Sequence, residues 1–97
     1  MTDIAVSCEP GPTDGWRCRV RLTQGGRLVG DHDVRVALAA LGRLDPGAGD
    51  PTGLVRRSFE FLLEREPPSS ILRSFELTEI GRYFPEYESR IVAGAED

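Results

Sequence analysis

The chain has 97 residues, a net charge of −4, and 39% hydrophobic and 29% charged residues, which predicts one folded domain with one core and excludes a disordered chain. The acidic balance opposes non-specific binding to nucleic-acid phosphates and to anionic membranes. The longest apolar run, residues 36–41, is far shorter than the roughly 20 residues that span a bilayer, and residues 1–6 lack the basic start of a secretory signal. We therefore expect a cytoplasmic protein whose residues 1–97 form a single domain and which has no membrane partner.

Two segments of alternating apolar residues predict an antiparallel hairpin at the N-terminus, because a period of two is typical of half-buried strands. The apolar residues of the first segment are Ile4, Val6 and Cys8. In the second segment, apolar residues alternate with arginines: Trp16, Cys18, Val20 and Leu22 with Arg17, Arg19 and Arg21. Matching the two apolar faces across the turn-rich residues 9–15 predicts that Ile4 lies opposite Val20. The same register pairs Asp3 with Arg21, which is a favourable charge pair.

The two cysteines fall on the apolar face of this hairpin. In the predicted register Val6 lies opposite Cys18 and Cys8 lies opposite Trp16, so the cysteines are diagonal neighbours. Two cysteines are too few for a zinc site. We expect both to be reduced core residues, as is usual in a cytoplasmic protein, because a disulfide would require a different register.

The residues after the hairpin predict a third strand and then leave two alternatives open. Gly25 and Gly26 favour a tight turn, and residues 28–29 begin the strand. Asp33 is a suitable cap for a helix whose apolar residues share one face for three turns: Val34, Ala37, Leu38, Leu41 and Leu44. Alternatively, Val34 and Val36 prolong the third strand. We favour the helix for residues 34–44.

A longer helix is predicted after the Pro- and Gly-rich residues 45–53. Asp50 followed by Pro51 is a typical helix start, and the helix is expected to run to about Arg65 and to end before Pro67 and Pro68. Its apolar residues cover more than half of the circumference: Leu54, Val55, Phe59, Phe61, Leu62 and Leu63. A helix with one buried side needs a narrower stripe, so this helix is either central or also contacts a partner.

The remaining C-terminal residues predict short elements. Residues 69–77 are either extended or a single turn, and Thr78 caps a short helix to Phe84. Pro85 either begins a last helix to about Val92 or kinks a continuous helix. We expect residues 93–97 to fray. Because strands precede helices, the expected class is α+β: an N-terminal antiparallel β-hairpin or three-stranded meander packed against three or four C-terminal helices.

Three groups of polar residues are candidate sites. Arg17, Arg19 and Arg21 share one strand face that suits phosphates or other anions, although a solvated sheet face is the favoured interpretation. His32 lies between two aspartates and is interpreted as part of a polar turn, and residues 47–53 lack the Lys of a phosphate-binding loop and are interpreted as a connector. We therefore expect no catalytic residues, no metal ligands, no cofactor and no enzymatic activity.

Aromatic side chains are concentrated in the C-terminal half and indicate either a core or an interface. The candidates for partner binding are Phe61, Phe75, Tyr83, Phe84 and Tyr87. The leading hypothesis is a non-enzymatic interaction or regulatory module that binds another protein or itself as a homodimer. The alternative is a nucleic-acid-binding regulator that uses the arginine face, which the negative net charge disfavours.

The C-terminal half also carries a distinctive set of short motifs. These are RSFEFLLEREP at 57–67, SIL at 70–72, FEL at 75–77 and IGRYFPEYE at 80–88. Together they resemble the C-terminal signature of small uncharacterised bacterial proteins. The resemblance implies a free-standing small bacterial protein, and it supplies no catalytic residues because no activity is attached to that group.

Overall fold

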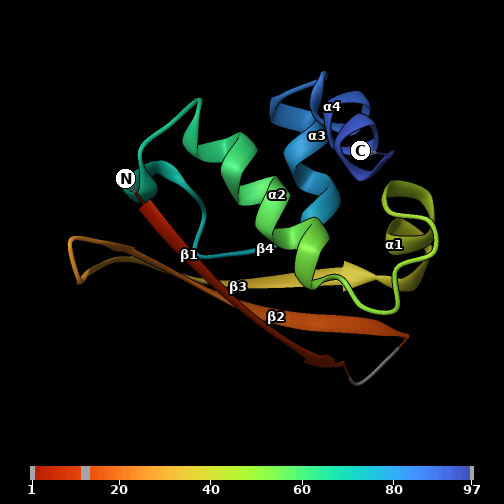
Figure 1. Ribbon diagram of the computed structural model, residues 1–97, viewed down its shortest axis with the longest axis horizontal. Coiled ribbons are helices and arrows are strands. Elements are labelled where there is room, and N and C mark those ends of the chain that lie inside the picture. Colours follow the sequence, from red (N-terminus) through yellow and green to blue (C-terminus); the bar gives the residue numbers. More distant parts are fainter. Residues whose placement is uncertain (1, 12–13, 97) are drawn as a thin grey trace.

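The computed structural model describes residues 2–11 and 14–96, which form one layer of strands covered on one face by helices (Figure 1). The elements follow in the order β1 (Thr2–Pro10), β2 (Gly15–Gln24), β3 (Arg27–Ala37), α1 (Leu38–Leu44), α2 (Thr52–Leu63), the 3₁₀ turn η1 (Pro68–Ser70), β4 (Ser74–Glu76), the 3₁₀ turn η2 (Leu77–Glu79), α3 (Ile80–Tyr83) and α4 (Tyr87–Glu96). The sheet order is β1-β2-β3-β4, with the first three strands antiparallel and β4 parallel to β3. The α+β class and the N-terminal meander are confirmed.

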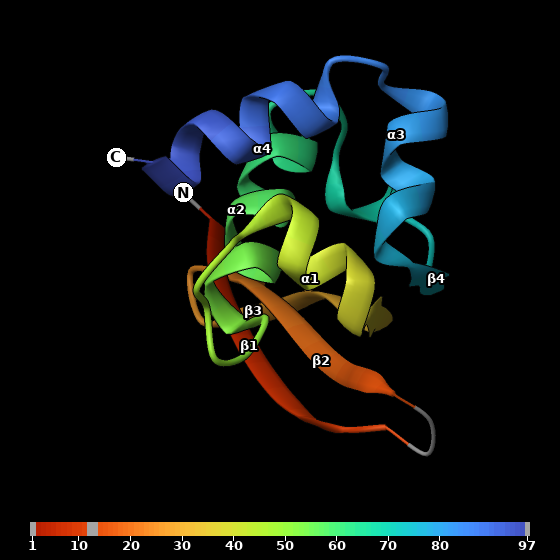
Figure 2. The same ribbon diagram turned by 90° about the vertical axis from the view of Figure 1, so that its right-hand side faces the viewer.

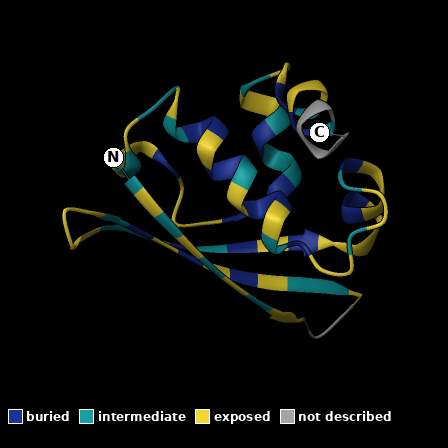
Figure 3. Ribbon diagram, in the orientation of Figure 1, coloured by how far each residue is buried: buried dark blue, intermediate teal, exposed yellow. Residues whose placement is uncertain are grey.

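The register of β1 against β2 differs from the prediction by two residues. Ile4 lies opposite Leu22 rather than Val20, and Asp3 lies opposite Thr23, so the predicted pair with Arg21 is wrong. A shift by two keeps every side chain on its face, so the alternation of apolar residues does not distinguish the two registers. The faces themselves are as predicted: along β2, Cys18, Val20 and Leu22 are fully buried and Trp16 is half-buried, in alternation with exposed residues (Figure 3).

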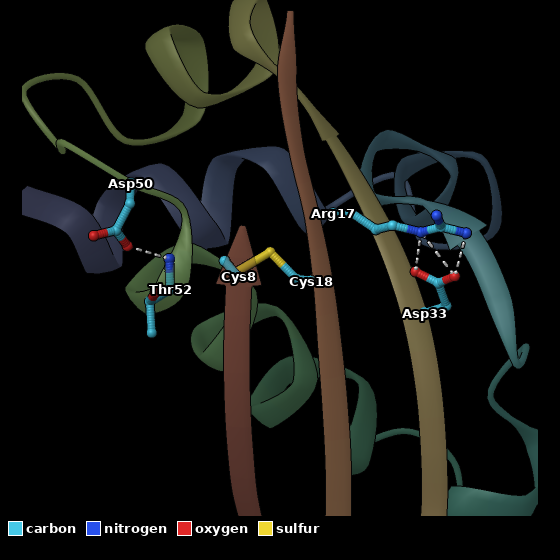
Figure 4. Close-up of a disulfide and its surroundings, with 6 residues drawn as sticks. All are labelled: Cys8, Arg17, Cys18, Asp33, Asp50 and Thr52. Carbon is cyan, nitrogen blue, oxygen red and sulfur yellow. Dashed lines mark hydrogen bonds and ion pairs between the residues drawn. A yellow bond between two sulfur atoms is a disulfide. The ribbon is translucent and has the colours of Figure 1, made fainter. Parts of the chain in front are cut away.

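The shifted register places Cys8 directly opposite Cys18, and the two form a disulfide (Figure 4). The prediction of two reduced cysteines is therefore wrong. It depended on the register, because diagonal neighbours are too far apart to bond, whereas the Cα atoms of this pair are 4.0 Å apart. The bond ties β1, at the edge of the sheet, to the inner strand β2.

Strand β3 continues to Ala37, so the helix predicted from residue 34 is wrong for its first four residues. Val34 lies opposite Cys18 and Val36 opposite Trp16, and both valines are buried on the inner face of the sheet. Pairing with β2 therefore overrides the helical spacing that the sequence analysis favours, and the β-branched valines suit a strand. Residues 38–44 are helical as predicted.

Helix α2 is the central helix of the domain, which explains its broad apolar surface. It lies between the sheet and helices α3 and α4 (Figures 1 and 2). Because α2 has neighbours on two sides, its buried residues cover a wide part of its surface. They are Leu54, Val55, Ser58, Phe59, Phe61 and Leu62. The width of the apolar stripe therefore needs no partner protein.

Asp50 lies at the start of α2, as the sequence predicts, but the helix begins at Thr52, one residue after Pro51, and ends at Leu63 rather than at about Arg65. The Asp50 carboxylate accepts a hydrogen bond from the backbone N–H of Thr52 at 2.8 Å (Figure 4). Hydrogen bonds from Thr52, through its side chain and then its backbone, lower the pKa of Asp50. Because the pKa is lower in the folded state, this stabilisation is present above the ordinary pKa of Asp and is lost as the pH falls through the lowered value.

We expect Asp50→Ala to lower the melting temperature by a few degrees, because it removes the acceptor at the start of α2. Asp50→Asn is the matched variant, since Asn is an equally good cap but has no carboxyl group to titrate. It should stay close to the wild type at neutral pH and should lose less stability than the wild type on acidification. Thermal unfolding at several pH values measures both effects, and an equal loss in the two variants would contradict the capping role.

The C-terminal segment returns to the sheet through β4, which the sequence leaves undecided. The backbone N–H of Asp33 donates to the carbonyl of Arg73 at 2.7 Å, and Phe75 of β4 is buried opposite Val34. The next turn is capped by Glu76, which accepts from the N–H of Thr78. The predicted cap, Thr78, is therefore wrong by two residues. Helix α4 begins two residues after Pro85, and Asp97 lies outside the described residues.

Candidate functional site

The candidate site is a hollow of about 370 Å³ between the end of α2, the segment around η1 and helix α3; we name it the apolar groove. Its floor consists of buried apolar side chains: Leu62, Ile71, Phe75 and Ile80. Its rim carries two large side chains that remain exposed, Leu72 at 50% and Tyr83 at 69%. The folded domain therefore leaves apolar surface in contact with water at the mouth of a concavity.

The aromatic residues singled out in the sequence divide between this groove and the core. Phe75, Tyr83 and Phe84 line the groove. Phe61 and Tyr87 are buried behind it, and the ring of Phe61 packs edge-on against Phe84 at 5.8 Å and against Tyr87 at 5.4 Å. Of the five predicted partner-binding residues, Phe61, Phe75 and Tyr87 are therefore buried, whereas Tyr83 is exposed and Phe84, which packs on Phe61, is half-buried.

The charged groups that line the groove are both acidic. Glu66 follows the end of α2, and Glu79 lies at the end of η2. One carboxylate oxygen of Glu79 accepts from the backbone N–H of Glu76 at 3.0 Å, which fixes the side chain as part of a capping box. Because no basic residue lines the groove among the described residues, its field favours a positively charged ligand group.

His32 connects the sheet to the rim of the groove. Its ring is buried on the inner face of β3, 5.4 Å from the ring of Phe59. Nδ1 lies 2.7 Å from the carbonyl oxygen of Leu72, and because a carbonyl only accepts, Nδ1–H is the donor. This hydrogen bond holds the backbone that carries the exposed Leu72 side chain.

The predicted polar turn at His32 is wrong because β3 continues through it. His32 belongs to the same alternation as Val34 and Val36, whereas the neighbouring Asp31 and Asp33 point to the outer face. Nε2 has no hydrogen-bond partner within residues 2–11 and 14–96. The same residues contain no cluster of His, Cys, Asp and Glu that would hold a metal ion.

The arginine face lies on the uncovered side of the sheet, where two of its three members form ion pairs with β3. Arg17 Nη2 lies 3.1 Å from Asp33 Oδ2 (Figure 4), and Arg19 Nη2 lies 2.8 Å from Asp31 Oδ2. The hydrogen bond from Arg19 lowers the pKa of Asp31. A phosphate would have to displace these carboxylates, so the geometry weakens the case for a nucleic-acid surface.

Residues 45–53 form a connector whose acidic groups already have partners. Asp45 Oδ2 lies 3.2 Å from Arg57 Nη2, and Asp50 accepts from Thr52 at the start of α2. The carboxylate of Asp50 occupies the position that an anion would take at this helix start. The connector interpretation therefore agrees with the geometry.

Comparisons with known proteins gave no match to a protein-family model, to a curated protein or to a solved structure. The resemblance of the C-terminal motifs to small bacterial proteins therefore stays a prediction. Within residues 2–11 and 14–96, no helix has the length and apolar character needed to cross a bilayer.

The sequence identifies only part of the groove. The spacing of Ile80, Tyr83, Phe84 and Tyr87 suits one helical face, and nothing in that spacing distinguishes the exposed Tyr83 from the buried Tyr87. Leu72, Glu66 and Glu79 carry no local signal, because the return of β4 to the sheet brings them together. A groove formed by three separate segments is a property of the tertiary fold.

Proposed function

We propose that the protein is a non-enzymatic protein-binding module. Its apolar groove receives an apolar side chain from a segment of a partner that also carries Arg or Lys. The observation on which this rests is the exposure of Leu72 and Tyr83 at the rim of a hollow with an apolar floor.

The rim side chains are expected to supply the binding energy. Burying a large apolar side chain contributes about 1.5–3 kcal/mol, and Tyr is enriched among the residues that dominate binding energy at protein interfaces. Tyr83 and Leu72 line the same hollow, so one inserted side chain would cover both. Among the residues whose burial is described, two other large apolar residues are similarly exposed, Leu28 and Leu38, but neither lines the groove.

The basic character of the partner follows from charge complementarity. Glu66 and Glu79 are the charged groups that line the groove, and the whole chain carries a net charge of −4. Arg or Lys beside the inserted apolar side chain would pair with these carboxylates and would speed association. An acidic segment would be repelled.

The test is a selection of random displayed peptides on the wild-type protein, followed by affinity measurements. We expect the enriched peptides to combine an aromatic or aliphatic residue with Arg or Lys. Tyr83→Ala and Leu72→Ala should each weaken their binding by about tenfold, which corresponds to roughly 1.4 kcal/mol. Both positions are exposed, so the fold should tolerate the changes.

Leu38→Ala is the matched control, because Leu38 is 53% exposed compared with 50% for Leu72 and lies outside the groove. It should leave peptide binding unchanged. The proposal is wrong if no peptide is enriched, or if the enriched peptides bind the two rim variants as tightly as the wild type.

A further inference from the structure

Strand β1 lies at an edge of the sheet, and the geometry determines which of its backbone groups point outward. In an antiparallel pair, residues that exchange no hydrogen bonds lie closer together than residues that do. The Cα atoms of Cys8 and Cys18 are 4.0 Å apart, so they form a pair of the first kind. The even-numbered residues of β1 therefore direct their N–H and C=O groups away from β2.

Two further observations agree with this assignment. The side chain of Arg56, on α2, donates from Nη1 to the carbonyl oxygen of Ile4 at 2.7 Å, so that this oxygen points away from β2. Pro10, which has no N–H, is also at an even position and costs the β1–β2 ladder no hydrogen bond. Within residues 3–9, the outward N–H groups thus belong to Ile4, Val6 and Cys8.

This outer edge of β1 has only part of the usual protection of an edge strand, namely Pro10 at its last position and Arg56 on the carbonyl of Ile4. Natural edges carry Lys, an internal Pro, a bulge or a covering segment. The chain has no Lys, residues 3–9 contain no Pro, and the register of β1 against β2 is continuous. Apart from Arg56 on Ile4, no hydrogen bond from the described part of the chain reaches the outward groups.

The side chains of β1 and of its neighbour β2 show which kind of partner strand would suit the outer edge of β1. On the outer face, β1 carries Asp3 and Glu9 but no basic residue, and β2 places Arg17 opposite Glu9. On the inner face, the side chains of Ile4 and Val6 remain half-buried. A strand added to the outer edge would place alternate side chains beside the acidic outer face and the apolar inner face of β1. A segment in which basic residues alternate with apolar ones therefore complements β1.

We propose that the outer edge of β1 binds an extended segment of a partner protein, in which Arg or Lys alternates with apolar residues, as an additional strand of the sheet. This surface is separate from the apolar groove. A second copy of the chain fits less well: pairing β1 with itself would place Asp3 and Glu9 of both copies on adjacent strands without a base between them, and both edges of β2 are already occupied.

The probe is a fluorescent peptide of alternating Arg and Val residues, and its binding is measured by anisotropy. Val6→Pro removes one outward N–H and no β1–β2 hydrogen bond, so the strand should form. Val6→Ala is the matched control, because it shortens the side chain and keeps the N–H. We expect Val6→Pro to bind at least about tenfold more weakly than Val6→Ala, and we expect a peptide with Glu in place of Arg not to bind.

Amide hydrogen exchange in the wild-type protein gives a second readout that needs no variant. The N–H groups of Ile4, Val6 and Cys8 should exchange quickly in the free protein and slowly with the peptide bound, while that of Ala5 should be protected in both states. Tyr83→Ala should bind this peptide as the wild type does, which separates this proposal from the groove.

Three results would overturn the proposal. The first is a lack of peptide binding by the wild-type protein. The second is equal affinity of Val6→Pro and Val6→Ala. The third is a dimer in light scattering that Val6→Pro abolishes, because the edge would then bind a second copy.

Discussion

Reduction of the Cys8–Cys18 disulfide is expected to lower the free energy of unfolding by about 3 kcal/mol. The bond closes a loop across a sequence separation of 10 residues and links the edge strand to the inner strand β2. Its main effect is to restrict the unfolded chain, which gains conformational freedom on reduction. A loss of this size is a large part of the 5–15 kcal/mol that stabilises a typical domain.

Urea unfolding with and without a thiol reductant measures this loss. The double variant Cys8→Ala/Cys18→Ala is the control: it should resemble the reduced protein or be somewhat less stable, since Cys18 is fully buried and its truncation leaves a small void. The reductant should not change the stability of this variant. If reduction leaves the wild-type unfolding midpoint where it was, the disulfide has no stabilising role.

The disulfide also bears on where the protein resides. Disulfides persist in oxidising compartments and are rare in the reducing cytosol, so this bond argues against the cytoplasmic location predicted from the sequence. Alkylation of free thiols in intact cells, followed by mass spectrometry, tests that prediction directly. Complete alkylation of Cys8 and Cys18 would support the cytoplasmic location, whereas protection of both would contradict it.

The sequence predicts the faces of the strands better than their register. Alternation places Val6, Cys18 and Val20 on the inner face in either register, because a shift by two residues leaves every side chain on its side. The register, and with it the disulfide, depends on how β1 is connected to β2, and there the N–H of Gly11 donates to the carbonyl of Gly15 at 3.0 Å. Composition alone does not specify that connection.

His32 shows how a local interpretation competes with a longer pattern. Its flanking aspartates suggest a polar turn, but residues 32, 34 and 36 share one face of β3, and that period was visible in the sequence. The start of α2, by contrast, follows from Asp50 and Pro51 because a helix cap is a purely local arrangement. The groove needs β4, whose pairing with β3 joins segments about 40 residues apart.

Tyr87 provides the hydrogen bond between helices α2 and α4 inside the core. Its side chain is fully buried, and its hydroxyl lies 2.7 Å from Oγ of Ser58. Ser58 donates its own proton to the carbonyl of Leu54 at 2.8 Å, so the Tyr87 hydroxyl must be the donor to Ser58. An ionised Tyr87 would lose this donor and would place a negative charge in the core.

Burial raises the pKa of Tyr87 from 10.0 to about 12, against a smaller lowering by the hydrogen bond with Ser58. Because the pKa is higher in the folded state, the stabilisation is complete below the unfolded pKa of 10.0 and is lost as the pH rises through about 12. A shift of this size corresponds to roughly 3 kcal/mol. We therefore expect the protein to lose about that much stability over this alkaline range.

Urea unfolding at a series of alkaline pH values measures this loss, and the variant Tyr87→Phe identifies its source. The variant should lose about 1 kcal/mol at neutral pH, because the hydrogen bond to Ser58 is gone. It should then show a much flatter decline at high pH, since it has no phenol to ionise. Tyr83→Phe, at an exposed position, should keep the wild-type profile. If Tyr87→Phe declined as steeply as the wild type, the alkaline loss would have to come from other groups, and the buried phenol would not be the group that limits stability at high pH.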